Sequence, residues 1–321
     1  MINGTAFSED VLEGLTSTPK QLPSKWIYDE RGDDLFLQVT KMPEYYLTSA
    51  EMEIFEYQSQ SMIKQLNVED MTPNIDIIEL GAGDGQKSLL LLRSLNEQNI
   101  KFQYIPIDIS SHSLDALECL LRHELPTIYM RKQQGDYLKA LNNLRDATDD
   151  WNIKSRIVLF LGNSIGNMIQ TEAEDFIFQL LNFLEKGDKL VLGVDLIKSD
   201  TVILPAYSGP RNLNFKLNML KRINDELGGN FDLTKFSNKS TYTKEEGILR
   251  DFIECDERQE VYVRAIDTRF ELDKGESIQI DMSYKYDDYR VNKLFNNKKA
   301  NFVCKLTDNR GYFADYIYEC M

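Results

Sequence analysis

Short apolar runs alternate with longer amphipathic stretches between residues 74 and 197 of the chain. Most of the apolar runs are nearly continuous, which is typical of strands that are covered on both faces. The stretches between them repeat their apolar residues with helical spacing. This succession predicts β-α-β units and therefore a mostly parallel sheet. The predicted strands are residues 75–80, 102–109, 129–135 (weaker), 157–161 and 190–196, and the predicted helices are residues 87–96, 112–124, 138–146 and 171–183.

The last segment of the chain has a different pattern. Two β-rich runs, residues 302–306 and 312–318, are separated by the turn Asp308-Asn309-Arg310-Gly311. Asp and Asn favour turns because their side chains bond the nearby backbone, and Gly favours them because it adopts positive φ without strain. The pattern predicts an antiparallel pair at the end of the parallel sheet.

The flanks of the chain lack this strand and helix rhythm. Residues 1–60 and 199–283 are rich in tyrosine, asparagine and charged residues. We expect these two segments to pair in space as an inserted α+β domain. Residues 61–198 and 284–321 would then form the α/β domain that carries the parallel sheet.

Composition narrows the classes of function. A chain of 321 residues with 42% hydrophobic residues can bury one large core or two modest ones. Its net charge of −15 repels phosphate backbones and anionic lipids, so neither a nucleic acid nor a membrane is expected as a partner. No secretory leader pattern and no run of about 18 apolar residues occurs, which predicts a cytoplasmic protein.

Metal binding and triad chemistry are poorly supported. The four cysteines are scattered without Cys-x-x-Cys spacing, so no metal site is expected. The two histidines, His112 and His123, lie in predicted helical stretches far from any nucleophile-elbow motif. The residues that carry the function are therefore expected among residue types other than cysteine and histidine.

A glycine-rich loop follows the first predicted strand, in the sequence Glu79-Leu80-Gly81-Ala82-Gly83-Asp84-Gly85. Glycines at such a turn let the backbone approach a ligand closely. The spacing differs from the G-x-G-x-x-G of dinucleotide-binding proteins, which disfavours a pyrophosphate ligand. It agrees better with the loop by which methyltransferases hold S-adenosylmethionine, where an acid such as Glu79 can face the positively charged end of the cofactor. The alternative is an ordinary glycine turn.

Two further strands end in an acid. Asp108 closes the second predicted strand, where a carboxylate can accept hydrogen bonds from ribose hydroxyls. Asp136 closes the third, where a carboxylate can accept a hydrogen bond from the adenine amino group. One such acid alone is more often a helix cap. Suitable groups at three successive strand ends favour an S-adenosylmethionine-dependent methyltransferase.

Specific sequence blocks then indicate a family. The N-terminal blocks are LPSKWIYD at residues 22–29, GDDLF at 32–36 and PEYYLT at 43–48, and LFLGNSIGN at 159–167 follows the fourth predicted strand. In order and spacing the chain resembles the histidine-specific α-N-methyltransferases of ergothioneine biosynthesis, over essentially its whole length. The resemblance implies a Rossmann-like class I methyltransferase sheet with an inserted substrate-binding domain.

The resemblance also implies roles for individual residues. Gly81, Lys87, Asp108 and Asp136 would contact the cofactor. Tyr28, Asn167 and Tyr207 would hold the amine and carboxylate of an amino acid, and Tyr45 would help to close the pocket.

The region around the loop adds weight to part of this assignment. Gly162 and Gly166 lie near Asn167 and would let a ligand approach it, and we expect Gly162 to contact the cofactor. Tyr28 and Asn167 suit a catalytic role because a phenol or an amide can accept a hydrogen bond without adding charge. The alternatives are that Tyr28 is packed aromatic surface and that Asn167 caps the next turn.

The strand at residues 280–286 matches the one whose acid and serine bind the imidazole side chain in the family. Asp281 and Ser283 are two residues apart, which on a strand points both to one face, although an exposed polar face would give the same pattern. The family usually has Glu at the position of Asp281 and a larger methionine at that of Val263. Both changes predict a roomier pocket.

Three hypotheses therefore follow from the sequence. The first is methylation of the α-amino group of L-histidine, up to the trimethyl betaine hercynine. The second is a related methyltransferase retargeted to a bulkier, for example aromatic, amino acid or derivative. The third is a non-catalytic cofactor-binding protein of the same fold.

Overall fold

The computed structural model describes residues 5–69, 74–146, 155–295 and 299–321. The chain divides into two compact units. The flank unit comprises Met1–Tyr45 and Lys198–Ser283, and the sheet unit comprises Tyr46–Ile197 and Tyr284–Met321. The first division falls at residues 45 and 46 rather than at residues 60 and 61 as we expected. The reason is α3 (Tyr46–Leu66), whose apolar side chains pack into the core of the sheet unit.

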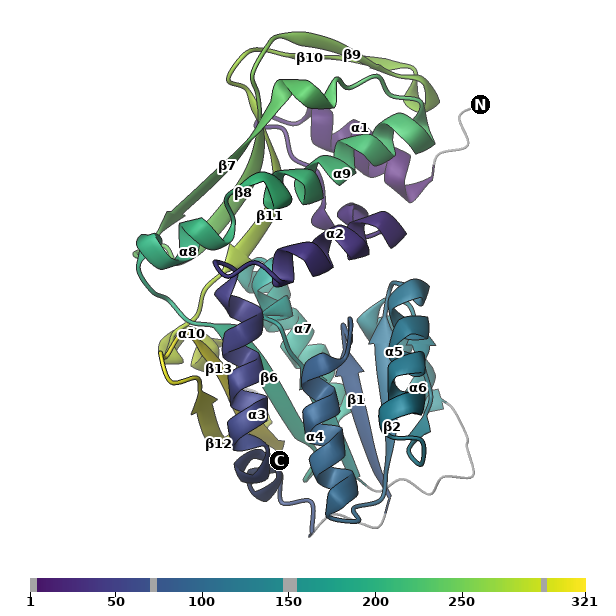
Figure 1. The fold of residues 1–321 in the computed structure, drawn as a ribbon, viewed down its shortest axis with the longest axis vertical. Helices are drawn as coiled ribbons and strands as arrows, with labels where there is room; N and C mark the ends of the chain where they lie inside the picture. The colour runs from purple at the N-terminus through teal and green to yellow at the C-terminus, as the bar shows by residue number, and fades with distance from the viewer. Residues whose placement is uncertain (1–4, 70–73, 147–154, 296–298) are drawn as a thin grey trace. The chain divides into compact units, whose positions relative to one another are not determined.

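One eight-stranded sheet forms the centre of the sheet unit, with the order β12-β13-β6-β5-β1-β2-β3 and β4 also paired with β2 (Figure 1). Its strands β1, β2, β5 and β6 are parallel, whereas β13 is antiparallel to both β6 and β12. The predicted parallel sheet with an antiparallel end is therefore confirmed. The strands are β1 (Ile75–Leu80), β2 (Phe102–Asp108), β3 (Tyr129–Met130), β4 (Gln133–Gln134), β5 (Ser155–Phe160), β6 (Lys189–Asp195), β12 (Ala300–Thr307) and β13 (Phe313–Cys320).

Helices cover both faces of this sheet. Because successive residues of a strand point to opposite faces, Ile77 and Ile78 of β1 enter two different apolar clusters. The cluster around Ile77 includes residues of α3, α4 (Gln86–Glu97) and α5 (Ser111–Glu124). The cluster around Ile78 includes residues of α6 (Tyr137–Asp146), α7 (Gln170–Phe183) and α10 (Asp288–Leu294). All six residues of β1 are buried, which explains its nearly continuous apolar run.

The parallel register brings three strand ends to one edge. Leu80 of β1 is paired with Ile107 of β2 and with Phe160 of β5. Ligands of open α/β sheets bind at this edge, where the strand order reverses direction. Here the reversal lies at β1, which has β2 on one side and β5 on the other.

One predicted strand is much shorter than expected. The run at residues 129–135 forms two separate two-residue strands, β3 and β4. The polar residues Arg131 and Lys132 interrupt it, and the side chains at this edge of the sheet are exposed or half-buried. The other predicted helices and strands of this unit are confirmed, with small differences at their ends.

The flank unit is α+β, as predicted. It holds a three-stranded sheet with the order β11-β8-β7 and a two-stranded sheet of β9 and β10. Helix α9 starts at Pro210 and ends before Gly228, a residue pair that favours a sharp helix start and stop. The elements are α1 (Ala6–Thr16), α2 (Glu30–Thr40), α8 (Asp200–Ala206), α9 (Pro210–Leu227), β7 (Phe236–Thr243), β8 (Ile248–Cys255), β9 (Gln259–Val263), β10 (Thr268–Leu272) and β11 (Ser277–Tyr284), with short 3₁₀ turns η1 (Ser24–Ile27), η3 (Leu233–Lys235) and η4 (Arg264–Ile266).

No helix in the described ranges is long and apolar enough to cross a membrane. Among the same residues, no group of three or more His, Cys, Asp or Glu side chains is arranged to hold a metal ion.

Candidate cofactor and acceptor residues

The glycine loop joins β1 to α4 through a tight turn. Gly81 has a φ of +73°, which L side chains rarely adopt, and a Cβ there would lie 2.7 Å from the Tyr137 hydroxyl. The Gly81 N–H donates to the carbonyl of Ile107 at 2.8 Å, which ties the loop to β2. Glycine is therefore required at this position by both the backbone conformation and the space.

Asp108 lies at the carboxyl end of β2, as the sequence predicted. Its side chain is half-buried. One carboxylate oxygen accepts the N–H of Gly83 at 3.0 Å, and the other accepts the N–H of Ser110 at 3.0 Å. Each oxygen retains a further lone pair that can accept a hydrogen bond from a ligand. Asp108 thus links the glycine loop to the start of α5.

Asp136 is exposed and caps α6. Its carboxylate accepts the N–H groups of Leu138 at 3.1 Å and Lys139 at 3.2 Å. This is the helix-cap alternative that the sequence left open, and both contacts use the same oxygen, Oδ1. Its second oxygen is left with capacity for a further donor.

Glu79 is 2% exposed and points into the interior of the sheet unit. The Tyr104 hydroxyl donates to its carboxylate. Burial raises the pKa of Glu79 to about 7, although hydrogen bonds from Ser88 and Tyr104 and the charge of Lys87 oppose the rise. Glu79 is therefore an interior carboxyl poised between its two charge states near neutral pH.

Glu51 is a residue that the sequence reasoning missed. It lies on α3 with a side chain that is 1% exposed, and its carboxylate forms an ion pair with Lys87 of α4. The N–H of Gly162 donates to the same carboxylate at 2.9 and 3.1 Å. Burial acts to lower the pKa of Lys87, but the neighbouring acids, Glu51 foremost, raise it overall. The sequence did contain a signal for Glu51, because it is a charged residue beside the apolar Ala50 and Ile54 on a buried helix face.

Gly162 completes this arrangement. Its φ is +71°, which L side chains rarely adopt, and a Cβ there would lie in van der Waals contact with Lys87 Nζ at 3.4 Å. Glu51 therefore holds both Lys87 and the loop after β5. Lys87 and Gly162 are two of the predicted cofactor residues, and the structure brings them together.

Asp315 of β13 is fully buried and was also missed. Within the described part of the chain, neither of its carboxyl oxygens has a hydrogen-bond partner. Burial raises its pKa well above the usual range, and the nearby Glu51 carboxylate adds to the rise. Burial therefore favours the neutral form of Asp315, which lies beside the Glu51 and Lys87 pair.

The two asparagines after β5 have different environments. Asn163 is buried, with its side chain accepting the Asp195 N–H at 2.9 Å and donating to the Tyr284 carbonyl at 3.2 Å. Asn167 ends the 3₁₀ turn η2 (Ser164–Asn167) and is exposed. Asn163 is thus a structural residue, whereas Asn167 is accessible to a ligand.

In the flank unit, the predicted acceptor tyrosines form one series of ring contacts. The ring of Tyr28 contacts Phe36 at a centroid distance of 5.8 Å, and Phe36 contacts Tyr45 at 6.2 Å. Tyr45 in turn contacts Tyr207 at 6.0 Å. The ring of Phe215, on α9, packs on Tyr28 and Phe36. The structure therefore brings together three residues that are far apart in the sequence.

Asp281 and Ser283 both lie on β11. Ser283 is buried and Asp281 is partly exposed, so the two side chains have different environments. Desolvation by its surroundings, followed by the charge of Asp251, raises the pKa of Asp281 to about 6, while Ser24 and Lys216 act to lower it. Val263, by contrast, is at the end of β9 with no exposed surface, in the apolar core. The charged neighbours of Asp281 are on β8 and α9, and the sequence reasoning missed both.

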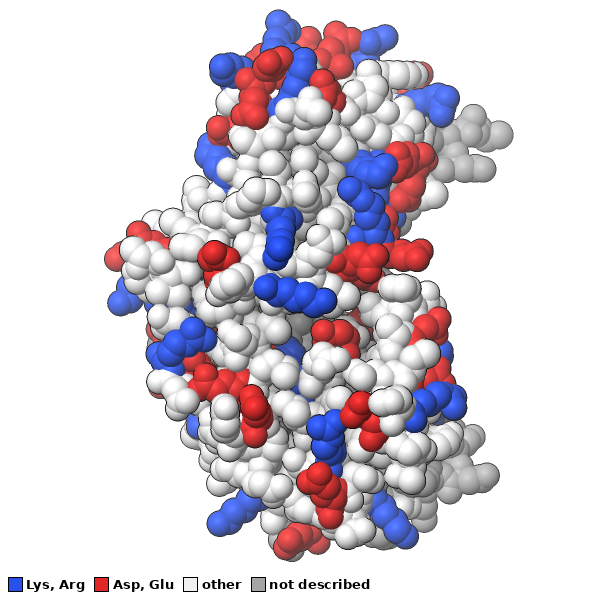
Figure 2. Space-filling view, viewed as in Figure 1, with Lys and Arg blue, Asp and Glu red and all other residues white. Residues whose placement is uncertain are grey.

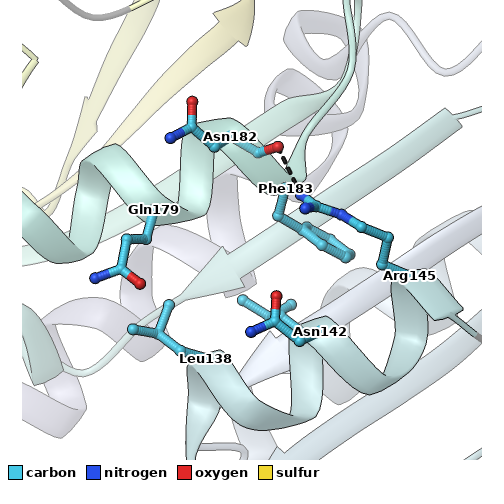
Figure 3. Close-up of a pocket in the computed structure, with 7 residues that line it drawn as sticks. Leu138, Asn142, Arg145, Gln179, Asn182 and Phe183 are labelled. Atoms are coloured by element: carbon cyan, nitrogen blue, oxygen red, sulfur yellow. Dashed lines mark hydrogen bonds between the residues drawn. The ribbon is translucent and has the colours of Figure 1, made fainter.

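Two surface hollows lie outside these groups. One, drawn in Figure 3, lies between α6 and α7, where Arg145 packs over Phe183 and donates to the Asn182 carbonyl at 2.6 Å. The other, mostly apolar, is in the flank unit and is lined by residues including Met42 and Pro205. None of the predicted site residues lines either hollow.

Charges of both signs are interspersed on the face of the molecule shown in Figure 2. Neither sign gathers into a continuous field there, in spite of the net charge of −15.

The fold and these residues define a class of protein. A parallel sheet that ends in an antiparallel pair, with a glycine loop after β1 and an acid after β2, is the Rossmann-like fold of class I methyltransferases. Residues 7–320 match the family described as "Histidine-specific methyltransferase, SAM-dependent". The chain belongs to that family of S-adenosylmethionine-dependent enzymes. The residues present fit the cofactor, because Gly81 and Gly162 leave the strand-end edge without side chains and Asp108 retains acceptor capacity there.

Named relatives act on different acceptors. The chain is 31% identical to "Histidine N-alpha-methyltransferase" of Mycobacterium tuberculosis, over 88% of this chain and 84% of the relative. It is 23% identical to "4-dimethylallyltryptophan N-methyltransferase easF" of Claviceps fusiformis, over 89% of this chain and 84% of the relative. Among solved structures, the CcbJ methyltransferase of Streptomyces caelestis is similar with a TM-score of 0.42 and 11% identity, over 88% of this chain and 98% of that one.

Proposed function

We propose that this chain transfers methyl groups from S-adenosylmethionine to the α-amino group of free L-histidine, giving Nα-methylated histidine up to the trimethyl betaine hercynine. The observation that supports this most is the series of ring contacts that joins Tyr28, Tyr45 and Tyr207 in the flank unit. These are the tyrosines that the family resemblance assigns to the amine and carboxylate of the amino acid. The 31% identity to a histidine methyltransferase adds support.

The cofactor would be held by the strand-end residues of the sheet unit. Main-chain groups of Gly81, Gly83 and Gly162 would line its binding region, with Lys87 as the nearby cation. Asp108 would accept hydrogen bonds from the ribose hydroxyls, and Asp136 would accept one from the adenine amino group. Glu79 would contribute a carboxylate whose ionised form is favoured by a cationic ligand. When bound, S-adenosylmethionine supplies a methyl group on a positively charged sulfur that is a good leaving group.

The protein's part in the reaction is chiefly alignment. The attacking nitrogen must approach the methyl carbon to about 3–3.5 Å, and it must first lose its proton because an ammonium has no lone pair. Tyr28 would orient the amine by a hydrogen bond that adds no charge. Tyr207 would hold the carboxylate, and Tyr45 would help to exclude water.

Asp281 and Ser283 would bind the imidazole. With a pKa of about 6, Asp281 is mostly ionised at neutral pH and can accept an N–H from the ring. Ser283 can donate to or accept from the second ring nitrogen.

A second candidate acceptor is a bulkier aromatic amino acid. Two observations favour it: Asp281 is one methylene shorter than the family's usual Glu, and a relative named for a prenylated tryptophan covers 89% of the chain. An indole N–H could also donate to Asp281.

The test is methyl transfer to free amino acids. Purified protein would be incubated with methyl-labelled S-adenosylmethionine and each of the common amino acids separately, and the products identified by mass spectrometry. We expect mono-, di- and trimethylated histidine. Faster turnover of tryptophan or tyrosine than of histidine would favour the second candidate. Tight cofactor binding with no product from any acceptor would support the non-catalytic alternative and would contradict both.

A further inference from the structure

Lys216 of α9 is a buried cation that the proposed reaction does not use. Its side chain is 2% exposed. The ammonium lies 2.9 Å from the Asp251 carboxylate and donates to the Asn238 side chain at 2.6 Å and to the Tyr207 carbonyl at 3.4 Å. An ammonium has three N–H donors, so these acceptors can satisfy it. The surroundings of Lys216 thus supply hydrogen-bond acceptors for its ammonium in the interior of the flank unit.

Asp251 connects this lysine to the candidate acceptor residues. It is 3% exposed and accepts a hydrogen bond from the Ser240 hydroxyl at 2.5 Å. It lies on β8, the strand next to β11, which carries Asp281. The negative charge of Asp251 acts to raise the pKa of Asp281, and the positive charge of Lys216 acts to lower it.

The charged groups that act on Asp281 are therefore Asp251 from β8 and Lys216 from α9. Ser24 adds a hydrogen bond from its hydroxyl, and Met282 adds one from its backbone N–H. With both acids ionised, the three charged groups carry one net negative charge. Without the lysine they would carry two, and two neighbouring carboxylates do not readily ionise together.

We propose that Lys216 is a positioning residue whose charge offsets that of Asp251 and keeps the Asp281 carboxyl ionised, and that it thereby sets a preference for acceptors whose side chain donates an N–H. This inference rests on the proposed function, in which Asp281 receives the acceptor side chain. A carboxylate can only accept hydrogen bonds, whereas a protonated carboxyl also presents an O–H. The charge state of Asp281 thus decides which side chains are bound.

Lys216 also has a structural contact, which the test must separate from its charge. The Tyr207 carbonyl accepts hydrogen bonds from Lys216 and from the Asn238 side chain at 2.9 Å. Removing the lysine leaves the Asn238 donor in place. A loss of activity alone would not distinguish the two roles, but a shift in pH dependence would.

The experiment compares kcat/KM for histidine between about pH 5 and pH 9 in the wild-type enzyme and in Lys216→Met, Asp251→Asn and the double variant. In Lys216→Met we expect the acidic limb of the profile to move up by about one pH unit. At a pH below the limb, kcat/KM should therefore fall about tenfold. The fall should come from a higher KM, with kcat little changed. In Asp251→Asn the limb should move down. The double variant removes both charges and should return the limb close to that of the wild type.

An unchanged limb in both single variants, or a double variant whose limb stays with that of Lys216→Met, would overturn the proposal. If Lys216→Met does not fold, Asp251→Asn still tests it through the opposite shift. If the wild-type enzyme does not methylate histidine, the proposed function fails. The same variants would then be compared by carbon NMR titration of the Asp281 carboxyl, which needs no acceptor, and a pKa that is the same in all of them would contradict the inference independently.

Discussion

Glu79 illustrates how a single buried carboxyl couples the sheet unit to pH. Its pKa in the folded protein is about 7, against 4.5 for an ordinary glutamate, because burial disfavours the charged form. Between these two values the folded state binds more protons than the unfolded state. Stability therefore decreases as the pH rises from about 4.5 through 7.

We predict that Glu79→Gln removes this pH dependence. Between pH 5 and pH 8, the wild-type protein should lose about 2–3 kcal/mol of unfolding free energy relative to the variant, because each unit of pKa shift corresponds to about 1.4 kcal/mol. Urea unfolding without cofactor at both pH values measures the difference. Glu97→Gln, on the exposed face of α4, is the control and should leave the pH dependence unchanged. Equal pH dependence in Glu79→Gln and the wild type would contradict the assignment.

Asp108 provides a second test at the level of one residue. Asp108→Ala removes the acceptor for the Gly83 and Ser110 N–H groups and the proposed ribose contact. We expect the affinity for S-adenosylhomocysteine to fall at least about tenfold, since hydrogen bonds to charged groups contribute about 1.5–3 kcal/mol. Isothermal titration calorimetry gives the dissociation constant. Asp115→Ala on the neighbouring α5, whose side chain is 67% exposed, is the matched control. The same affinity in both variants would remove Asp108 from the site.

At the scale of elements, the turn between β1 and α4 depends on how closely α4 and α5 pack. Gly85 is the residue before α4, with a φ of +65°, and a Cβ there would lie 2.1 Å from Leu117 Cδ1 of α5. Gly83 has a φ of +53° in the same loop, but a Cβ there would meet nothing within 4 Å. The two glycines therefore separate the cost of backbone conformation from the cost of a clash.

We predict that Gly83→Ala destabilises the protein by about 1–2 kcal/mol, the cost of a left-handed conformation for an L residue. Gly85→Ala should cost at least about 1 kcal/mol more, because Leu117 or the backbone must also move. Chemical denaturation without cofactor measures both. In a Leu117→Ala background the difference between the two variants should largely disappear. Equal costs in the original background would mean that α5 adapts without strain.

At the scale of the whole molecule, the two units are expected to respond to different ligands. A ligand that binds only the native state reduces local opening around its contacts. We predict that S-adenosylhomocysteine slows hydrogen exchange in the sheet unit, at residues 81–85 and at the start of α5. Adding histidine should slow exchange further in the flank unit, in α9 and β11. Asp108→Ala should lose the first effect. Protection by histidine confined to the sheet unit would contradict the assignment of the acceptor residues.

Much of the sheet unit follows from the sequence because the relevant signals are local. The apolar run of β1 reflects burial of all six residues, and the glycines at 81, 83 and 85 each adopt positive φ. Asp108 was placed at a strand end because the strand itself was recognised, and the N-terminal blocks indicated the family. Short-range periodicity and residue-specific backbone preferences thus determined the sheet, its loop and the class of cofactor.

The remaining features depend on contacts between distant parts of the chain, which no local pattern reports. Only the tertiary structure places Glu51 on the N–H of Gly162, 111 residues away, and assigns α3 to the sheet unit. It also pairs Lys216 with Asp251, and the charges of both act on Asp281. The pKa of a buried group depends on which charges folding brings within a few ångströms of it. The sequence therefore determined the class of cofactor, and the packing of α9 against β8 decided which charges act on the residue proposed to bind the acceptor side chain.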